Sequence, residues 1–211
     1  MKKEIDIRYI PGIESLTDTE LVKELSGTAE ETVSCVNWNE YPYRPEVKFN
    51  IAFSDTHLAL LYTVVEEHIL GTVLEDNGPV WEDSCVETFI KDPVGEGYYN
   101  IEVNCIGTPL AAHRLSRTDF EHFDAERMSR IRCFSSLGHE ATDRKDGEWT
   151  VCELIPFELL GLDKAPESLE MNFYKCGDNC RSPHYLSWSP IGLPSPNFHC
   201  PEYFGMINLI K

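Results

Sequence analysis

Basic side chains are scarce in this sequence. Its 211 residues include 18 lysines and arginines against 36 aspartates and glutamates, a formal net charge of −18. A surface with this excess of negative charge repels phosphate backbones and other polyanions. We therefore expect no nucleic-acid partner, and heavily sulfated glycans are disfavoured for the same reason.

Long apolar segments are also missing. No run approaches the roughly 20 apolar residues that a membrane-spanning helix needs, so we expect no membrane partner. The first residues, MKKEID, lack the apolar region of a signal peptide. This favours a cytoplasmic location, or a periplasmic or secreted one if a leader once preceded residue 1.

Helix signals are few, whereas strand signals recur along the chain. Thr17 or Asp18 with Glu20 predicts the start of one short N-terminal helix that stops at Gly27. The remainder reads as eight to ten short strands separated by turn residues, which is typical of an all-β, antiparallel β-sandwich. We expect residues 1–37 to form an N-terminal extension packed on the domain, and residues 38–211 to form the sandwich itself.

The stretch 81–108 is the most informative part of the sequence. Two strand-like runs flank the loop DPVGEG, a pattern that predicts a β-hairpin. If Lys91 lies opposite Tyr98, counting places Glu87 directly opposite Glu102, with Cβ atoms roughly 5 Å apart. Like charges in that position are destabilising, so we expect compensation by a cation, by a raised pKa, or by a ligand rich in hydroxyl groups.

The same face of the hairpin carries two amides, Asn100 and Asn104. Each can both donate and accept hydrogen bonds, as the recognition of a sugar requires. A turn at residues 106–107 predicts a third strand over 108–114 that places the small Ala111 beside Glu102. The alternative interpretation is a solvated sheet face with scattered acidic residues.

Eight cysteines are present, and several occupy strand positions where a free cysteine acts as a small apolar residue. In the absence of a signal peptide we expect reduced thiols and no structural disulfide. The set Cys176, Cys180 and His184, with His199 and Cys200 further on, lacks the paired short spacings of structural zinc sites. We therefore assign no metal ligands.

Several motifs together resemble the family 9 carbohydrate-binding modules, and most of all their stand-alone relatives in Bacteroidetes. They are the segment WEDSCVE at 81–87, the strand and turn at 149–160, and LSWS at 186–189 followed by YFG at 203–205. They occur in the family's order over residues 38–211.

The resemblance implies a DOMON-like sandwich and a lectin-like, non-catalytic role: the end of a sugar chain is held between two tryptophans above a polar sheet face. It implies no cofactor apart from calcium, for which the scattered aspartates give no ligand pattern. Arg114 and Lys175 are candidates for the family's arginine near the sugar. The resulting predicted carbohydrate-binding set is Trp81, Glu87, Asn100, Glu102, Asn104, Asn172 and Trp188.

Other interpretations remain open from the sequence. Glu87 and Glu102 approach the carboxyl separation of about 5 Å found in retaining glycosidases, although an open sheet face lacks the burial that raises one pKa. An interaction module with a non-functional sugar site is a further alternative, and core packing is the alternative for each tryptophan. The segments 1–37 and 116–128 could cover the site. The sequence identifies neither the sugar nor any protein partner.

Overall fold

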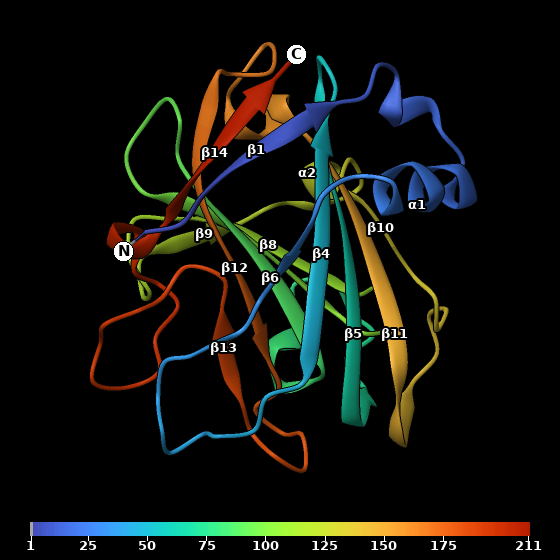
Figure 1. Ribbon diagram of the computed structural model, residues 1–211, viewed down its shortest axis with the longest axis vertical. Coiled ribbons are helices and arrows are strands. Elements are labelled where there is room, and N and C mark those ends of the chain that lie inside the picture. The colour runs from blue at the N-terminus through green and yellow to red at the C-terminus, as the bar shows by residue number, and fades with distance from the viewer. Residues whose placement is uncertain (1) are drawn as a thin grey trace.

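The strands form one continuous sheet that folds over into two facing layers (Figure 1). This computed structural model describes residues 2–211, so the first residue of the predicted N-terminal extension lies outside the described residues. The predicted β-sandwich is confirmed. One layer, with β4, β5 and β11 side by side in Figure 1, consists of β10 (Arg132–Ser135), β11 (Thr142–Pro156), β5 (His57–Gly71), β4 (Glu46–Phe53) and β2 (Glu30–Thr32).

The second layer runs diagonally behind the first in Figure 1 and carries the hairpin of residues 85–104. Short strands at its edge come from distant parts of the chain. The layer consists of β14 (Gly205–Ile210), β12 (Ser168–Cys176), β6 (Cys85–Lys91), β7 (Tyr98–Asn104), β8 (Pro109–Arg114) and β9 (Phe120–His122), with β13 (Tyr185–Ser187) and β3 (Cys35–Val36) beside β12.

Strand β1 (Glu4–Tyr9) joins the two layers. It pairs in parallel with β14 on one side and with β4 on the other. The sheet is therefore mixed, and the expectation of a purely antiparallel sandwich is wrong at this point. The first strand of the predicted N-terminal extension lies within the sheet, because its backbone supplies the only hydrogen-bonded link between β4 and β14 in the strand order of residues 2–211.

The helices are short and lie outside the sheet. Helix α1 (Asp18–Ser26) begins with a capping box between Thr17 and Glu20, as the sequence predicts, and Gly27 is its C-cap. It covers the outer face of β4, β5 and β11 by burying Leu21 and Leu25. The others are α2 (Ala125–Met128) and 3-10 turns at Ile13–Ser15, η2 (Val80–Glu82), Phe157–Leu160 and Pro201–Tyr203.

The hydrophobic core fills the space between the two layers. Alternate side chains of β4, β5 and β11 face alternate side chains of β6, β7 and β12, as the two-residue period of a strand requires. A second apolar cluster covers the opposite face of β6, β7 and β12, where loop residues such as Trp38, Phe198 and Phe204 pack against Phe89 and Tyr174. Strands β6 and β7 are thus covered on both faces, which leaves only a local opening above them.

The hairpin register predicted from the sequence is confirmed. Lys91 pairs with Tyr98, and Glu87 pairs with Glu102. The register predicted for the next strand is wrong by one residue, because Leu110, and not Ala111, lies opposite Glu102. The cause is a three-residue connection with Gly107 at φ 81°, whereas a two-residue turn was predicted.

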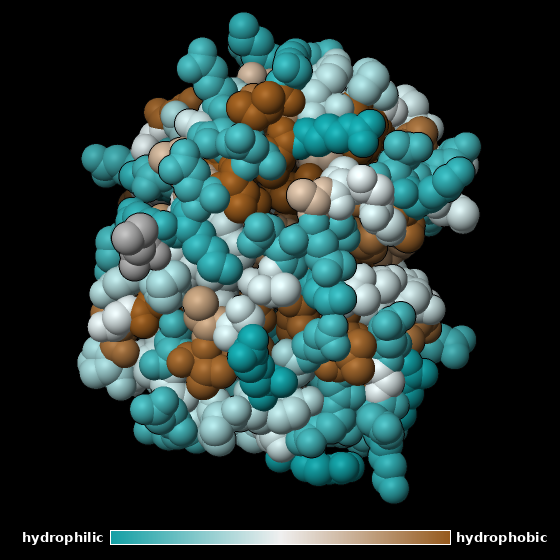
Figure 2. Space-filling view, viewed as in Figure 1, coloured by the Kyte–Doolittle hydropathy of each residue, from teal (hydrophilic) through white to brown (hydrophobic). Residues whose placement is uncertain are grey.

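The described residues include no helix that is long and apolar enough to cross a membrane. Figure 2 shows the face over β1 and β4, where hydrophilic side chains dominate and apolar ones form small separate groups. Each of the eight cysteines carries a free thiol.

A carboxyl group lies inside the core, between the two layers. Glu153 of β11 is fully buried, and its Oε2 accepts a hydrogen bond of 2.8 Å from the Thr88 hydroxyl, which in turn is 2.8 Å from the Tyr62 hydroxyl. Burial raises the pKa of Glu153 to about 8 from its ordinary value of 4.5, while the Thr88 hydrogen bond opposes this rise. The raised pKa favours the neutral carboxylic acid at pH 7.

We expect Glu153→Gln to raise the free energy of unfolding at pH 7 by about 3 kcal/mol. Below pH 4.5 the acid is protonated in both the folded and the unfolded chain, so it contributes no penalty. As the pH rises from 4.5 to about 8, only the unfolded chain loses the proton, and stability falls by about 1.4 kcal/mol per pH unit. The amide cannot ionise and avoids this loss.

The measurement is urea denaturation of both proteins at pH 4, 7 and 9. The difference should be small at pH 4 and largest at pH 9. Glu148→Gln, at an exposed position of the same strand, is the control and should change stability little. A stability difference that does not vary with pH would show that Glu153 is not held neutral in the core.

Candidate functional site

A pocket of about 300 Å3 opens above the outer face of β6, β7, β8 and β12. Its floor is the polar face of the hairpin, and its walls are loops and short elements from four separate parts of the chain. Charged and polar lining residues are Glu87, Glu102, Arg114, Arg117, Asp178 and Asn197. The remaining lining residues are Trp81, Phe120, Tyr185, Phe198, Pro196, His199 and Cys176.

Two carboxyl groups meet in the floor of this pocket, as the register requires. Glu87 and Glu102 are both nearly inaccessible to solvent. Burial raises the pKa of Glu87 well above its usual range, and the neighbouring Cys176 and Glu102 raise it further. Burial also raises the pKa of Glu102, to about 7, against the opposing effects of Asn100 and Arg114. Of the forms of compensation expected from the sequence, the buried environment favours a raised pKa.

Of the two carboxyl oxygens of Glu102, one accepts a hydrogen bond and the other has no partner within residues 2–211. Asn100 Nδ2 donates to Glu102 Oε1 at 2.7 Å, and Arg114 Nε donates to Asn100 Oδ1 at 2.8 Å. Glu102 Oε2 is buried and has no hydrogen-bond partner within residues 2–211. An unpaired buried oxygen costs free energy, so a hydroxyl group or water molecule that reached Oε2 from the pocket would stabilise Glu102.

Aromatic rings form the walls of the pocket. Trp81 lies in η2 and is 37% exposed, and Phe120 of β9 is 44% exposed. Arg114 contributes to the same wall, with its guanidinium carbon 4.1 Å from the centre of the Phe120 ring. Exposed rings next to buried hydrogen-bonding groups are typical of sites that bind ligands with both apolar and polar faces.

The turn that carries Trp81 is fixed by Asp83. The Asp83 carboxylate accepts hydrogen bonds from the backbone N–H groups of Thr72 and Val73 and from the Asn104 side chain, each at 2.8 to 2.9 Å. Asn104 also donates to the Val73 carbonyl. Its amide is thus occupied in holding the loop before η2, so Asn104 supports the position of Trp81 and does not line the pocket.

The prediction that Trp188 forms the second wall of a sugar clamp is wrong. Trp188 is fully buried in the core between the layers, where it contacts Phe49 and Phe173 edge to face and donates from Nε1 to Glu31 at 3.0 Å. The strand period explains this position. Its backbone N–H bonds to the Phe173 carbonyl at the end of β13, so Leu186 and Trp188 share the core face while the flanking serines face away.

Asn172 lies on the expected face of β12 but not in the pocket. Its Oδ1 accepts from the Ser189 N–H at 2.8 Å, and its Nδ2 donates to the Ser189 carbonyl at 3.1 Å. The side chain therefore anchors the segment after β13. Of the seven residues predicted from the sequence, the structure brings together Trp81, Glu87 and Glu102 in the pocket, with Asn100 one hydrogen bond beneath them.

The two candidates for a basic residue near the sugar, Arg114 and Lys175, lie in different parts of the structure. Arg114 lines the pocket, whereas Lys175 faces the core on β12. Lys175 Nζ lies 2.9 Å from Glu66 Oε2, and both side chains are almost fully buried. Trp149 donates to the other oxygen of Glu66 at 2.6 Å, and His184 Nε2 lies 2.8 Å from Lys175 Nζ. This buried ion pair belongs to the core and not to the site.

Sequence reasoning missed most of the wall residues. Arg117 and Phe120 come from segment 116–128, for which the sequence indicated only that the segment as a whole could cover the site. Asp178 and His199 come from loops, and Tyr185 begins the short strand β13. Irregular segments have no regular alternation of side chains, so counting residues could not predict which of their side chains face the pocket. No residue of segment 2–37 lines the pocket.

Comparison with known proteins gives a family match over most of the chain. The family model described as Carbohydrate-binding family 9 matches residues 18–209. No curated protein matches the chain. A crystal structure from Bacteroides uniformis ATCC 8492, provisionally described as a carbohydrate-binding protein, is 32% identical, with a TM-score of 0.94 and full coverage of both chains.

Two structures of a family 9 carbohydrate-binding module from Caldicellulosiruptor kristjanssonii share the fold. The complex with glucose has 15% identity and a TM-score of 0.60, and covers 99% of this chain and 96% of its own. The complex with cellotriose has 15% identity and a TM-score of 0.63, with coverage of 98% and 93%.

Proposed function

This chain belongs to carbohydrate-binding family 9, and from that premise we propose that the pocket beside Trp81 binds a mono- or oligosaccharide. Family membership indicates a non-catalytic binding protein. The observation that carries the assignment to this pocket is that Trp81, with its exposed ring, and Glu102, whose buried Oε2 is unpaired within residues 2–211, line the same cavity.

The chemistry of a pyranose suits these groups. Its C–H faces stack on aromatic rings, and its hydroxyl groups donate to carboxylate oxygens and accept from guanidinium N–H groups. Trp81 provides the stacking surface, Glu102 the acceptor and Arg114 the donor. In place of a second tryptophan, Phe120 and Tyr185 border the pocket.

A pocket of about 300 Å3 is at the small end of ligand sites and suits one or two sugar units. The net charge of −18 disfavours acidic sugars. The structures of the family 9 module with glucose and with cellotriose make glucose and cello-oligosaccharides the first probes to use.

Hydrolysis by Glu87 and Glu102 does not fit the site. A retaining glycosidase requires one ionised nucleophile and one protonated acid, with a pKa difference between the two. Here burial raises the pKa of both groups, and Glu87 Oε1 accepts a hydrogen bond of 3.0 Å from the Cys176 thiol. Neither group is thus prepared as a nucleophile, in agreement with the family assignment.

We expect Trp81→Ala to weaken sugar binding by about 30-fold or more, because the loss of a stacking wall costs about 2 kcal/mol. Isothermal titration calorimetry with glucose, cellobiose, xylobiose and galactose measures the effect. The melting temperature should fall by only a few degrees, because more than a third of the Trp81 side chain is already exposed.

Trp81→Phe is the matched control, since it keeps an aromatic surface and should retain part of the affinity. Glu102→Gln tests the acceptor in the same titration. Wild-type protein that binds none of these sugars would support an interaction module with a non-functional site. Unchanged affinity in folded Trp81→Ala would place the sugar elsewhere.

A further inference from the structure

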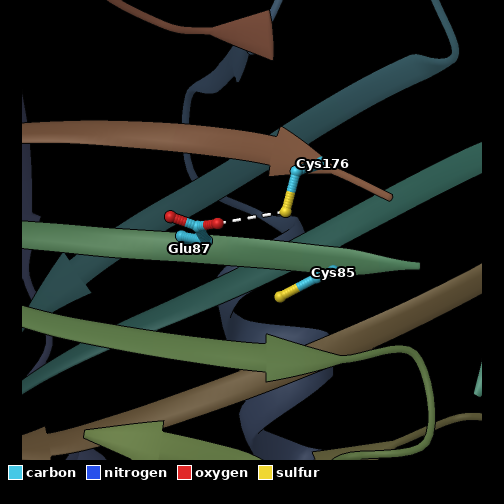
Figure 3. Close-up of side chains that lie close together, drawn as sticks. All are labelled: Cys85, Glu87 and Cys176. Atoms are coloured by element: carbon cyan, nitrogen blue, oxygen red, sulfur yellow. Dashed lines mark hydrogen bonds between the residues drawn. The ribbon is translucent and has the colours of Figure 1, made fainter. Parts of the chain in front are cut away.

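Three potential metal ligands converge beneath the pocket. Cys85 and Glu87 lie two residues apart on β6 and therefore share its outer face, and Cys176 of β12 pairs directly with Cys85. Figure 3 shows the three side chains side by side, with the Cys176 thiol directed at the Glu87 carboxyl group. One ligand atom from each of the three lies within 4.8 Å of the other two.

We propose that Cys85, Cys176 and Glu87 form a binding site for a thiophilic divalent cation such as Zn2+. Zinc binds thiolates at about 2.3 Å and carboxylate oxygens at about 2.0–2.2 Å, so tetrahedral ligands lie roughly 3.5–4 Å apart. The ligand atoms of the cluster lie within 4.8 Å of one another, close to these separations. Regular strand pairing, which fixes the three Cα positions, pre-organises the set.

Two further carboxyl groups lie close to the cluster. Glu102 lies opposite Glu87 across the hairpin, and Asp178 lines the same pocket as Glu87 and Cys176. All three side chains of the cluster are buried, and none of the three can carry a positive charge. A divalent ion would replace the thiol protons, release them to solvent, and balance the charge of the two thiolates.

The site is accessible from the pocket. Glu87 and Cys176 both line the pocket, so a hydrated ion can reach them without rearrangement of the core. Three protein ligands leave a fourth position for water or for another oxygen donor, the arrangement found in open zinc sites. Because Glu87 belongs both to this cluster and to the sugar pocket, occupancy by the ion would change the hydrogen-bonding groups that a sugar meets.

The test uses the full chain, freed of metal by chelation and kept reduced with a phosphine. We expect calorimetric titration with Zn2+ to show one ion per chain. Co2+ should give the absorption bands of a tetrahedral thiolate complex. Cys85→Ser and Cys176→Ser should each weaken Zn2+ binding by at least about 100-fold, since even supporting residues around zinc sites alter affinity by 10- to 100-fold. Cys35→Ser, which removes a thiol outside the cluster, should bind as wild type.

Alkylation gives a second measurement that does not depend on variants. Because both thiols are buried, the reaction is run in urea just below the unfolding transition, where Zn2+ should slow the alkylation of two thiols, identified by mass spectrometry as Cys85 and Cys176. The absence of saturable Zn2+ binding would overturn the inference, as would binding that persists in folded Cys85→Ser and Cys176→Ser. No sugar is needed in these experiments, so they stand or fall separately from the proposed carbohydrate binding.

Discussion

Replacing Trp188 by alanine is expected to lower the free energy of unfolding by about 3–5 kcal/mol, as for other large buried aromatic residues. The side chain is fully buried against Phe49 and Phe173, and its Nε1 bonds to Glu31. Neighbouring atoms fit the ring closely, since a Cβ at Gly205 would collide with it. The truncation would thus leave a cavity and an unpaired Glu31. Chemical denaturation measures the change.

Trp188→Phe is the control, because it fills most of the cavity and should recover a large part of the lost stability. The comparison with Trp81→Ala is the most informative one: one tryptophan governs stability and the other governs binding. A Trp188→Ala protein as stable as the wild type, but unable to bind sugar, would contradict the buried position and restore the two-tryptophan clamp.

Lys175→Met is expected to destabilise the protein by a similar amount, about 3–5 kcal/mol, because it leaves the buried carboxylate of Glu66 without its cation. It also removes donors to His184 Nε2 and to the Cys176 carbonyl, each 2.8 Å from Nζ. The denaturation midpoint in urea, with the slope checked for two-state behaviour, measures the loss.

The double variant Lys175→Met with Glu66→Gln is the matched control. It removes both charges, and the glutamine oxygen can still accept the Trp149 N–H. We expect it to be more stable than Lys175→Met alone, because the main cost lies in the unpaired charge. If the two variants are equally unstable, the lost packing of Lys175, and not the charge of Glu66, accounts for the effect.

The regular parts of the fold were predictable because their period is short and local. Alternation and the loop DPVGEG were sufficient to place Glu87 opposite Glu102, and a capping box was sufficient to start α1. These features depend on residues close in sequence. The error at Ala111 arose where the turn length was ambiguous, because one additional residue in the turn shifts every pair that follows.

The pocket was only partly predictable, for a different reason. Whether an aromatic residue stacks on a ligand or packs in the core depends on which face its strand presents, and serines on either side of Trp188 did not reveal that face. Leu186 was the available signal, because a residue two positions away on a strand shares the face. The interior positions of Lys175 and Glu153 could not be predicted, because each depends on a partner on a strand far away in the sequence.

The position of β1 has a consequence for the order in which this protein folds. Strand β1 is synthesised roughly 200 residues before β14, which is one of its two partners. Contacts of such long range are slow to form, because the intervening chain must be brought together first. The edge of β1 that pairs with β14 therefore stays open during synthesis. The two halves of the nascent sheet become one closed structure only after Gly205–Ile210 has left the ribosome, and until then the open edge is exposed to non-native pairing.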